Sequence, residues 1–422
     1  MSKWLHFGAG NIFRGYIAAL ADTIGEKVIA AETFDTDIIE KIYKPFNNRV
    51  ILVTLKANGS TVRREITSIA EATCDTARLR EIFLQPELQM VSFTITEKGY
   101  AGPLMPLLAE LLRARFEADA APLALVSMDN CSQNGKILRE AVMKLADGDF
   151  ASYLDEKVSF PWSMIDKITP RPAESVRDAL EAGGIENMDI IVTSKGTYIA
   201  PFVNAEAAEY LVIEDDFPNG RPPLEKAGVY FTDRETVGKA ERMKVTTCLN
   251  PLHTALAVFG CLLGYKAIWK AMRDPDLVKL VKKIGYDEGL PVVTHPGIFE
   301  PRDFLDEVVN ERLPNPFIPD TPQRIATDTS QKIPIRFGET IKAYQSIGGA
   351  YQLIGIPLAI AGWLRYRDGL DDGLNPMEIS PDPAYSGEIR EEIAGLLPKI
   401  TEYYNKMQGK GAVRALLREV LQ

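Results

Sequence analysis

Residues 3–25, "KWLHFGAGNIFRGYIAALADTIG", predict a short strand, a glycine turn and then a helix that begins near Ile12. Gly8 and Gly10 suit a tight turn, and they let backbone amides approach a diphosphate at the positive end of the helix. The pattern departs from G-x-G-x-x-G, because Phe13 occupies the third glycine position and Gly15 follows two residues later. Taken alone, the stretch fits either a dinucleotide-binding turn or an ordinary strand-to-helix turn.

The next segment favours the dinucleotide. Residues 27–37, "KVIAAETFDTD", predict a second strand that ends in acid, with Asp35 twenty residues after Gly15. A carboxylate at this position accepts both adenosine ribose hydroxyls and repels a 2′-phosphate, so we expect NAD in preference to NADP. A nearby arginine in the fold would reverse that preference. The alternative is that Asp35 caps the helix predicted at "DTDIIEKI".

Three apolar runs closed by polar residues predict further parallel strands: residues 48–55, 90–100 and 123–130. Ligands of such sheets bind at the carboxyl ends of the strands. Polar residues at two of these ends are either solvated loop and cap residues or parts of a site. The predicted cofactor-binding residues are Gly8, Gly10, Asn11, Phe13, Arg14, Asp35, Thr96, Glu97, Lys98 and Asn130.

The second half of the chain has a different character. From about residue 236 it predicts long amphipathic helices, such as residues 275–290 and 386–407. We place the boundary in the polar stretch "FTDRETVGKAE", residues 231–241. The sequence therefore predicts an α/β protein: a Rossmann-type domain at 1–235, followed by a mostly α-helical domain at 236–422.

Composition narrows the possible partners. The 422 residues carry a formal net charge of -10, which disfavours nucleic acid and anionic membranes but leaves room for a small anion in a local basic pocket. Four scattered cysteines and three histidines predict reduced thiols and no zinc or other metal site. The N-terminus lacks an apolar signal segment and "TALAVFGCLLGY" is too short to span a bilayer, so we expect a cytoplasmic protein. The oligomeric state is left open.

Two stretches place polar groups where they are costly. "ERMKVTTCLNPLH", residues 241–253, sets a glutamate, a lysine, an amide and an imidazole at the mouth of an apolar helix. They are either catalytic or the parts of a capped helix with a snorkelling lysine and a satisfied core histidine. Residues 315–336 place Arg324 and Lys332 eight apart, either as surface charges or as substrate contacts.

These stretches, with "FGAGNIFRG", "TEKGY", "SMDNCSQNG" and "RIATD-x-SQK", resemble the polyol-specific long-chain dehydrogenases. That family includes mannitol 2-dehydrogenase, fructuronate reductase (mannonate oxidoreductase) and tagaturonate reductase. The resemblance covers almost the whole chain. It implies a Rossmann-type domain, a mostly helical second domain and an active site in the cleft between them. It also implies NAD(P)-dependent, metal-independent oxidation of a secondary alcohol, with a lysine as general base.

The resemblance also assigns residues. It makes Lys244 the base, places Asn250 and His253 beside the reacting oxygen, and makes Glu241 a proton relay to solvent. The implied substrate contacts are Asp166, Arg324 and Lys332, with Asn130 lining the same site. Burial and neighbouring cations are the means by which a protein lowers the pKa of a lysine base toward the working pH.

One spacing departs from the family pattern. The family usually separates the lysine from the asparagine by four residues, whereas five separate Lys244 from Asn250 here. Because the other spacings hold, we predict a one-residue bulge at "VTTC", residues 245–248. The alternative places Val245 at the lysine position, which would leave no base.

The expected function is NAD-dependent hydride transfer to or from a sugar acid, interconverting D-fructuronate and D-mannonate or tagaturonate and altronate. Arg324 suits the sugar carboxylate, because its planar fork favours bidentate pairing. A hexitol 2-dehydrogenase of the mannitol type is the alternative within the same chemistry. A catalytically inactive NAD- and sugar-binding sensor is the alternative of another class, and the extra residue after Lys244 is the feature that supports it.

Overall fold

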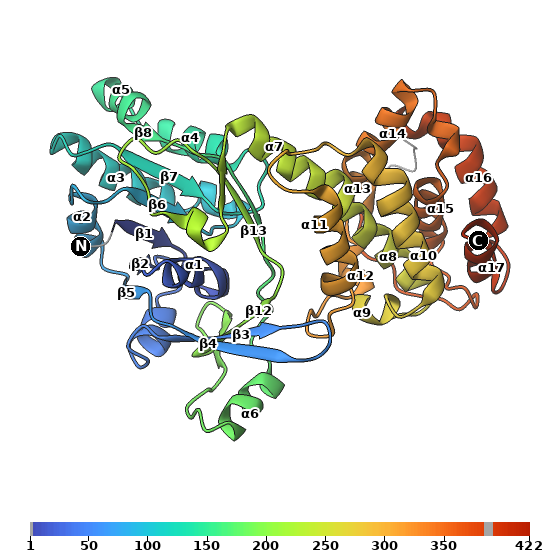
Figure 1. Cartoon of the computed structure of the whole chain (residues 1–422), viewed down its shortest axis with the longest axis horizontal. Coiled ribbons are helices and arrows are strands. Elements are labelled where there is room, and N and C mark those ends of the chain that lie inside the picture. Colours follow the sequence, from blue (N-terminus) through green and yellow to red (C-terminus); the bar gives the residue numbers. More distant parts are fainter. Residues whose placement is uncertain (1–2, 384–390) are drawn as a thin grey trace. The chain divides into compact units, whose positions relative to one another are not determined.

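The computed structural model describes residues 3–383 and 391–422, so residues 386–390 of the helix predicted at 386–407 lie outside the described part. The chain forms two compact units. The first joins the residues up to Leu55 with Ser60–Gly238, and the second joins Lys56–Gly59 with Lys239–Gln422. In the colours of Figure 1, blue to green marks most of the first unit and yellow to red most of the second.

A parallel sheet of six strands forms the centre of the first unit, in the order β5-β2-β1-β6-β7-β8. This is the doubly wound order, in which the direction of winding reverses between β1 and β6 and leaves a crevice for ligands at the carboxyl ends. The predicted Rossmann-type fold is therefore confirmed. The strands are β1 (Trp4–Phe7), β2 (Val28–Ala31), β5 (Ile69–Thr73), β6 (Met90–Phe93), β7 (Leu123–Ser127) and β8 (Val158–Ser159).

Helices cover both faces of this sheet, because alternate strand residues point to opposite faces. In β1, Trp4 packs into one core together with the π-helical turn Phe13–Ile17 and α1 (Ala18–Thr23). Leu5 and Phe7 pack into the opposite core, which four helices cover (Figure 1). These are α2 (Thr76–Phe83), α3 (Leu104–Glu117), α4 (Asn134–Met143) and α5 (Gly148–Lys157).

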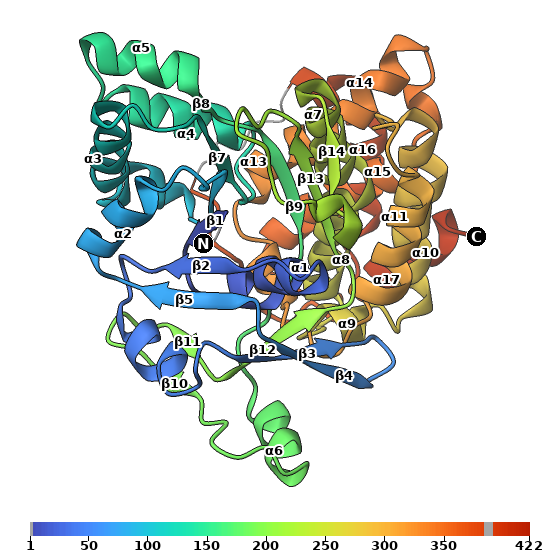
Figure 2. The same ribbon diagram turned by 60° about the vertical axis from the view of Figure 1, so that its left-hand side comes forward.

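The prediction that residues 48–55 form a strand of the parallel sheet was wrong. They contain β3 (Val50–Leu55), which lies in a separate sheet between β12 (Phe202–Glu206) and an antiparallel neighbour, β4 (Thr61–Ile66) (Figure 2). The reason is local, because Lys56–Gly59 forms a tight turn that returns the chain into β4, with the amide of Gly59 donating to the carbonyl of Lys56 at 3.0 Å and a φ of 86° at Gly59. The strand beyond β2 in the main sheet is instead β5.

The remaining elements of the first unit are short. A second small sheet has the order β14-β13-β9, and a two-stranded hairpin joins β10 to β11. Their bounds, with that of the remaining helix, are β9 (Ser163–Asp166), β10 (Ile191–Val192), β11 (Tyr198–Ile199), β13 (Tyr210–Glu214), β14 (Tyr230–Thr232) and α6 (Glu174–Ala182).

The second unit is helical, with α8 (Asn250–Leu262) and α15 (Gly355–Arg367) packed together at its centre. Gly362 permits their close approach, because a Cβ there would lie 2.6 Å from the ring of Phe259. The other helices of this unit are α9 (Ile268–Ala271), α10 (Pro275–Lys282), α11 (Pro301–Glu307), α12 (Pro322–Ile325), α13 (Thr329–Arg336), α14 (Gly338–Ser346), α16 (Leu397–Lys406) and α17 (Ala412–Val420). The helix α7 (Arg234–Met243) begins in the first unit and ends in the second.

Among residues 3–383 and 391–422, one helix has the length and composition needed to cross a bilayer, Arg234–Leu262. Of its most apolar window, 83% is buried inside the protein. A helix that is apolar on every side and packed among other helices is typical of a protein core.

Candidate active site

The glycine turn after β1 has a geometry that only glycine adopts easily. Gly8 has a φ of 102°, and a Cβ there would lie 2.7 Å from the backbone oxygen of Thr94. At Gly10, by contrast, no atom lies within 4 Å of the position that a Cβ would take. The turn is therefore packed on the side of β6 and open at Gly10, where a diphosphate would approach the helix that follows.

Two of the predicted cofactor-binding residues bury their side chains at the start of the helix. Phe13 is fully buried and stacks on His6, with ring centroids 4.6 Å apart. Arg14 is also fully buried, and its Nη2 donates to the carbonyl oxygens of Ala200 and Phe202, each at 2.7 Å. We therefore assign both side chains to holding the helix in the core rather than to the cofactor. Asn11 keeps a buried Oδ1 that accepts no hydrogen bond within the described part of the chain.

Two carboxylates follow β2. Asp35, predicted to bind the ribose, is buried and accepts a 2.6 Å hydrogen bond from Thr193 Oγ1. Glu32 was not identified from the sequence, although it follows the strand directly. Its Oε2 accepts from the amide of Ala9 in the glycine turn at 3.0 Å, and its Oε1 accepts from the amide of Asp35 at 3.1 Å. The carboxylate of Glu32 thus joins the end of β2 to the glycine turn.

The carboxyl ends of β6 and β7 carry the other predicted cofactor contacts. Thr96, Glu97 and Lys98 are exposed, at the start of the 3₁₀ helix Glu97–Ala101. Tyr100 in that helix donates to the carboxylate of Asp129, beyond β7, so the two strand ends are linked. Asn130 follows Asp129 and is exposed.

Asp166, predicted to contact the substrate, belongs to the first unit. It ends β9 opposite Tyr210 of β13 and is 6% exposed.

The predicted bulge at residues 245–248 is confirmed. Lys244–Cys248 forms a π-helical turn between α7 and α8, in which the amide of Leu249 donates to the carbonyl of Lys244, five residues earlier, at 3.1 Å. One extra residue would rotate everything before it by about 100° around a regular helix. A wide turn of this kind can absorb that rotation, and the assignment of Lys244 to the family's lysine position stays a prediction.

Lys244 is 7% exposed, although a lysine is seldom buried in a folded protein. The turn that carries it packs against α13 and α14. Asn250 and His253 follow on the first turn of α8 and are partly exposed, as is Glu241 one turn before the lysine. Three of the four residues predicted to be catalytic thus border solvent, and the fourth, Lys244, is enclosed by the fold.

His253 and Asp320 approach each other from distant segments. His253 Nε2 lies 3.4 Å from Asp320 Oδ2, with 17% of the imidazole side chain exposed. The angle between them does not form a hydrogen bond, and Nε2 has no other partner among the described residues. Burial lowers the pKa of His253 to about 4, against an opposing effect of Asp320 and with Arg336, Arg324 and Arg312 adding to the decrease. The imidazole is therefore neutral near pH 7.

The cations of residues 315–336 converge near His253. Arg324 pairs with Asp320, and its side chain is 62% exposed. Lys332 is half-buried on α13 and donates to the carbonyl oxygens of Ile325 and Thr327. Burial lowers the pKa of Lys332, and Arg336 adds to the decrease. Asp320 and Arg336 were missed in the sequence, although each lies four residues from a predicted residue: Asp320 before Arg324, and Arg336 after Lys332.

Because His6 and His253 are buried, we expect the free energy of unfolding to decrease in acid. Burial lowers the pKa of His6 to about 3 and that of His253 to about 4, below the ordinary 6.5. As pH falls from 6.5 toward 4, the unfolded chain binds protons that the folded chain rejects, so the free energy of unfolding decreases, by on the order of 3 kcal/mol for each histidine. Above pH 6.5 both are neutral in either state and contribute nothing. Urea unfolding at pH 7.5, 6.5, 5.5 and 4.5 checks this.

The matched variants for this experiment are His6→Gln and His253→Asn. Each should lose less stability on acidification than the wild type, and the double variant less than either. An equal loss in all four proteins would assign the acid sensitivity to the carboxylates alone.

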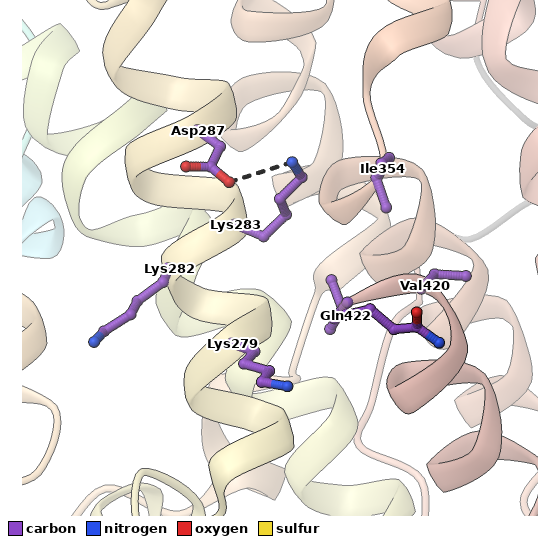
Figure 3. A pocket seen from close by; sticks show the side chains of 8 residues that line it. Lys279, Lys282, Lys283, Asp287, Ile354, Val420 and Gln422 are labelled. Carbon is purple, nitrogen blue, oxygen red and sulfur yellow. Dashed lines mark hydrogen bonds and ion pairs between the residues drawn. The ribbon is translucent and has the colours of Figure 1, made fainter.

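The second unit also has a surface pocket, and its lining includes none of the charged residues described above around His253. It has a volume of about 320 Å³ and includes Lys279, Lys282, Lys283 and Asp287 in its lining (Figure 3). Lys283 points to Asp287, with 3.2 Å between Nζ and Oδ2, while Lys282 extends away from the other labelled side chains. Its lysines therefore do not converge on one point, and we assign it no part in the chemistry.

Comparison with known proteins matches the chain to two domain families, one for each half of the sequence. Residues 2–226 match the mannitol dehydrogenase Rossmann domain, and residues 237–420 match the mannitol dehydrogenase C-terminal domain. The chain is 49% identical to D-mannonate oxidoreductase of Thermotoga maritima, with 99% of this chain and 92% of the relative covered.

Solved structures show the same fold. Substrate-free D-sorbitol dehydrogenase superimposes with a TM-score of 0.86 at 24% identity, covering 98% of this chain and 94% of the other. Mannitol 2-dehydrogenase of Pseudomonas fluorescens, in a ternary complex with NAD and D-mannitol, gives a TM-score of 0.74 at 24% identity, covering 100% and 94%. With both domain families matched in order over nearly its whole length, the chain belongs to the mannitol dehydrogenase family and is an oxidoreductase.

Proposed function

We propose that the protein is an NAD-dependent reductase of keto-uronates, interconverting D-fructuronate and D-mannonate, or tagaturonate and altronate, without a metal ion. The observation that carries the proposal is the 49% identity, over 99% of this chain, to a relative named D-mannonate oxidoreductase. A sugar acid is an anion, which the arginines near His253 would attract, but Arg324 and Lys332 are compatible with a neutral hexitol as well.

Four residues of the helix Arg234–Leu262 have a proposed role in catalysis. Lys244, which is 7% exposed, takes the hydroxyl proton during oxidation and returns it during reduction. Asn250 donates from its amide to the developing oxygen charge. His253, neutral near pH 7, orients the hydroxyl. Glu241, partly exposed one turn away, passes the proton to solvent.

The glycine turn fits a dinucleotide. Gly10 leaves open space before the helix, and buried oxygens of Asn11 and Asp35 have no hydrogen-bond donor among the described residues. Glu32 and Asp35, both acidic and both beyond β2, would favour ribose hydroxyls and oppose a 2′-phosphate, so we propose NAD rather than NADP. When bound, the nicotinamide would supply the hydride acceptor for oxidation and the donor for reduction.

The two alternatives have different support. A hexitol 2-dehydrogenase uses the same helix and the same base, and Arg324 and Lys332 are compatible with it. The inactive sensor depended on the extra residue between Lys244 and Asn250, and the π-helical turn accommodates that residue. We therefore keep the hexitol alternative and set the sensor aside.

The test is NADH oxidation at 340 nm with D-fructuronate, D-tagaturonate and D-fructose in parallel, repeated with NADPH. We expect turnover of one keto-uronate with NADH, and a kcat/KM at least about 100-fold higher than for D-fructose, as the loss of a charge-assisted pair would give. Turnover of D-fructose alone would establish the hexitol enzyme instead. Binding of NADH without turnover of any substrate would restore the sensor.

A further inference from the structure

Arg336 is a partly buried cation without a counter-ion among the described residues. It ends α13, one turn after Lys332, and its Nη1 donates to Thr254 Oγ1 at 2.5 Å. That hydroxyl is its one hydrogen-bond acceptor within residues 3–383 and 391–422. Burial lowers the pKa of Arg336 to about 10, with no carboxylate opposing the decrease.

Another arginine of the same unit shows how the fold satisfies a buried guanidinium. Arg365 is 1% exposed and donates to three carbonyl oxygens, those of Met407 at 3.1 Å, Leu370 at 2.9 Å and Asp371 at 3.2 Å. Such acceptors offset the loss of hydration that burial causes. Arg336 differs, because one hydroxyl is its partner and its remaining N–H groups are not among the buried atoms that lack a partner, so these donors reach solvent and can bind a ligand.

The position of Arg336 is beside the proposed reacting groups. Thr254, which receives its hydrogen bond, directly follows His253 on α8. Arg336 is also close enough to His253 and to Lys332 to lower both of their pKa values.

Charged groups around His253 shift its pKa in opposite directions. Asp320 is the carboxylate that raises the pKa of His253, and it already pairs with Arg324. Arg312, Arg324 and Arg336 all act in the opposite direction. Asp328 and Asp382 raise the pKa of Lys332 against the effect of its burial. The guanidinium of Arg324 is thus occupied by a carboxylate of the protein itself, whereas that of Arg336 is not.

We propose that Arg336 binds the carboxylate of the sugar acid and so determines the preference for a sugar acid over a neutral polyol. This inference rests on the proposed reductase function and transfers the role that the sequence suggested for Arg324. A planar guanidinium offers two parallel N–H donors to a carboxylate, and Thr254 holds the fork in place from one side. Arg324 and Asp320 then form an ion pair without net charge at the more exposed edge of the proposed substrate site.

The experiment compares two substrates that differ only in the carboxylate, D-fructuronate and D-fructose, with saturating NADH. Arg336→Gln should lower kcat/KM for D-fructuronate by about 100-fold, mostly through KM, because a charge-assisted bidentate pair is lost. The loss for D-fructose should stay within about threefold, because that substrate makes no such pair. Arg336→Lys keeps the charge without the fork and should fall between the wild type and Arg336→Gln.

Arg324→Gln is the matched control, since it removes the neighbouring arginine and should affect both substrates alike. Titration calorimetry of D-mannonate and D-mannitol with the NADH-bound enzyme makes the same comparison without turnover. Equal losses for both substrates in Arg336→Gln, or a carboxylate-selective loss in Arg324→Gln instead, would overturn the assignment while leaving the reductase function standing. If the wild type neither turns over a keto-uronate nor binds D-mannonate, the proposed function fails and this inference fails with it.

Discussion

Lys244→Ala is expected to lower kcat for the keto-uronate by about 10³- to 10⁴-fold, because the variant loses its general base. The affinity for NADH should change little, since the glycine turn belongs to the first unit. Stopped-flow absorbance at 340 nm gives the rate of hydride transfer, and quenching of tryptophan fluorescence gives the affinity. Small primary amines added to the variant should restore part of the rate by replacing the missing amino group.

The matched control is Lys279→Ala, which removes an exposed lysine from α10 and should leave kcat unchanged. A Lys244→Ala protein that folds, binds NADH and keeps its rate would show that another group is the base. Loss of rate without amine rescue, together with a lower midpoint of thermal unfolding, would make the lysine structural instead.

Gly8→Ala is expected to weaken NADH binding by about 100-fold or more and to destabilise the first unit by about 2–4 kcal/mol. The φ of 102° is unfavourable for alanine, and the new Cβ would lie 2.7 Å from the Thr94 oxygen and 2.8 Å from its Oγ1. The turn must then move away from β6, which misplaces the backbone amides that a diphosphate would approach. Fluorescence titration with NADH and thermal unfolding measure the two effects separately.

Gly10→Ala distinguishes an effect on NADH binding from an effect on the stability of the fold. Nothing lies within 4 Å of its Cβ position, so its stability should match that of the wild type, whereas NADH binding should still weaken because the methyl group enters the open space proposed for the diphosphate. Normal NADH binding by both variants would mean that the dinucleotide does not use this turn.

The sequence reached the Rossmann-type fold because its signals are local. A glycine turn between a strand and a helix, and apolar runs that end in polar residues, report on neighbours along the chain. The bulge was predicted from the resemblance, because the family spacing leaves one extra residue between Lys244 and Asn250, which must be absorbed within a turn or rotate the remainder of the helix. The sequence assigned β3 to the wrong sheet, because an apolar run does not show which strands it pairs with. The Asn58-Gly59 pair that follows β3 is a hairpin signal that could have corrected this.

Only the tertiary structure showed where the side chains of Phe13 and Arg14 lie. Position within a motif does not show whether a side chain points to the ligand or into the core, and both of these are fully buried. Arg14 reaches carbonyl oxygens of the strand segment near residue 201, which nothing in the first twenty residues foretells.

By itself, the sequence determined the family, through motifs spread over almost the whole chain, and the glycine turn and the order of Lys244, Asn250 and His253 along one helix, which are set by spacing within a short stretch. The tertiary structure decided which charges meet. Thr254 and Arg336 are 82 residues apart in the chain, and only folding brings them into contact. Only folding, too, pairs Arg324 with Asp320 and leaves Arg336 without a carboxylate among the described residues. Electrostatic balance depends on distances through space, and these become defined only when the helices pack.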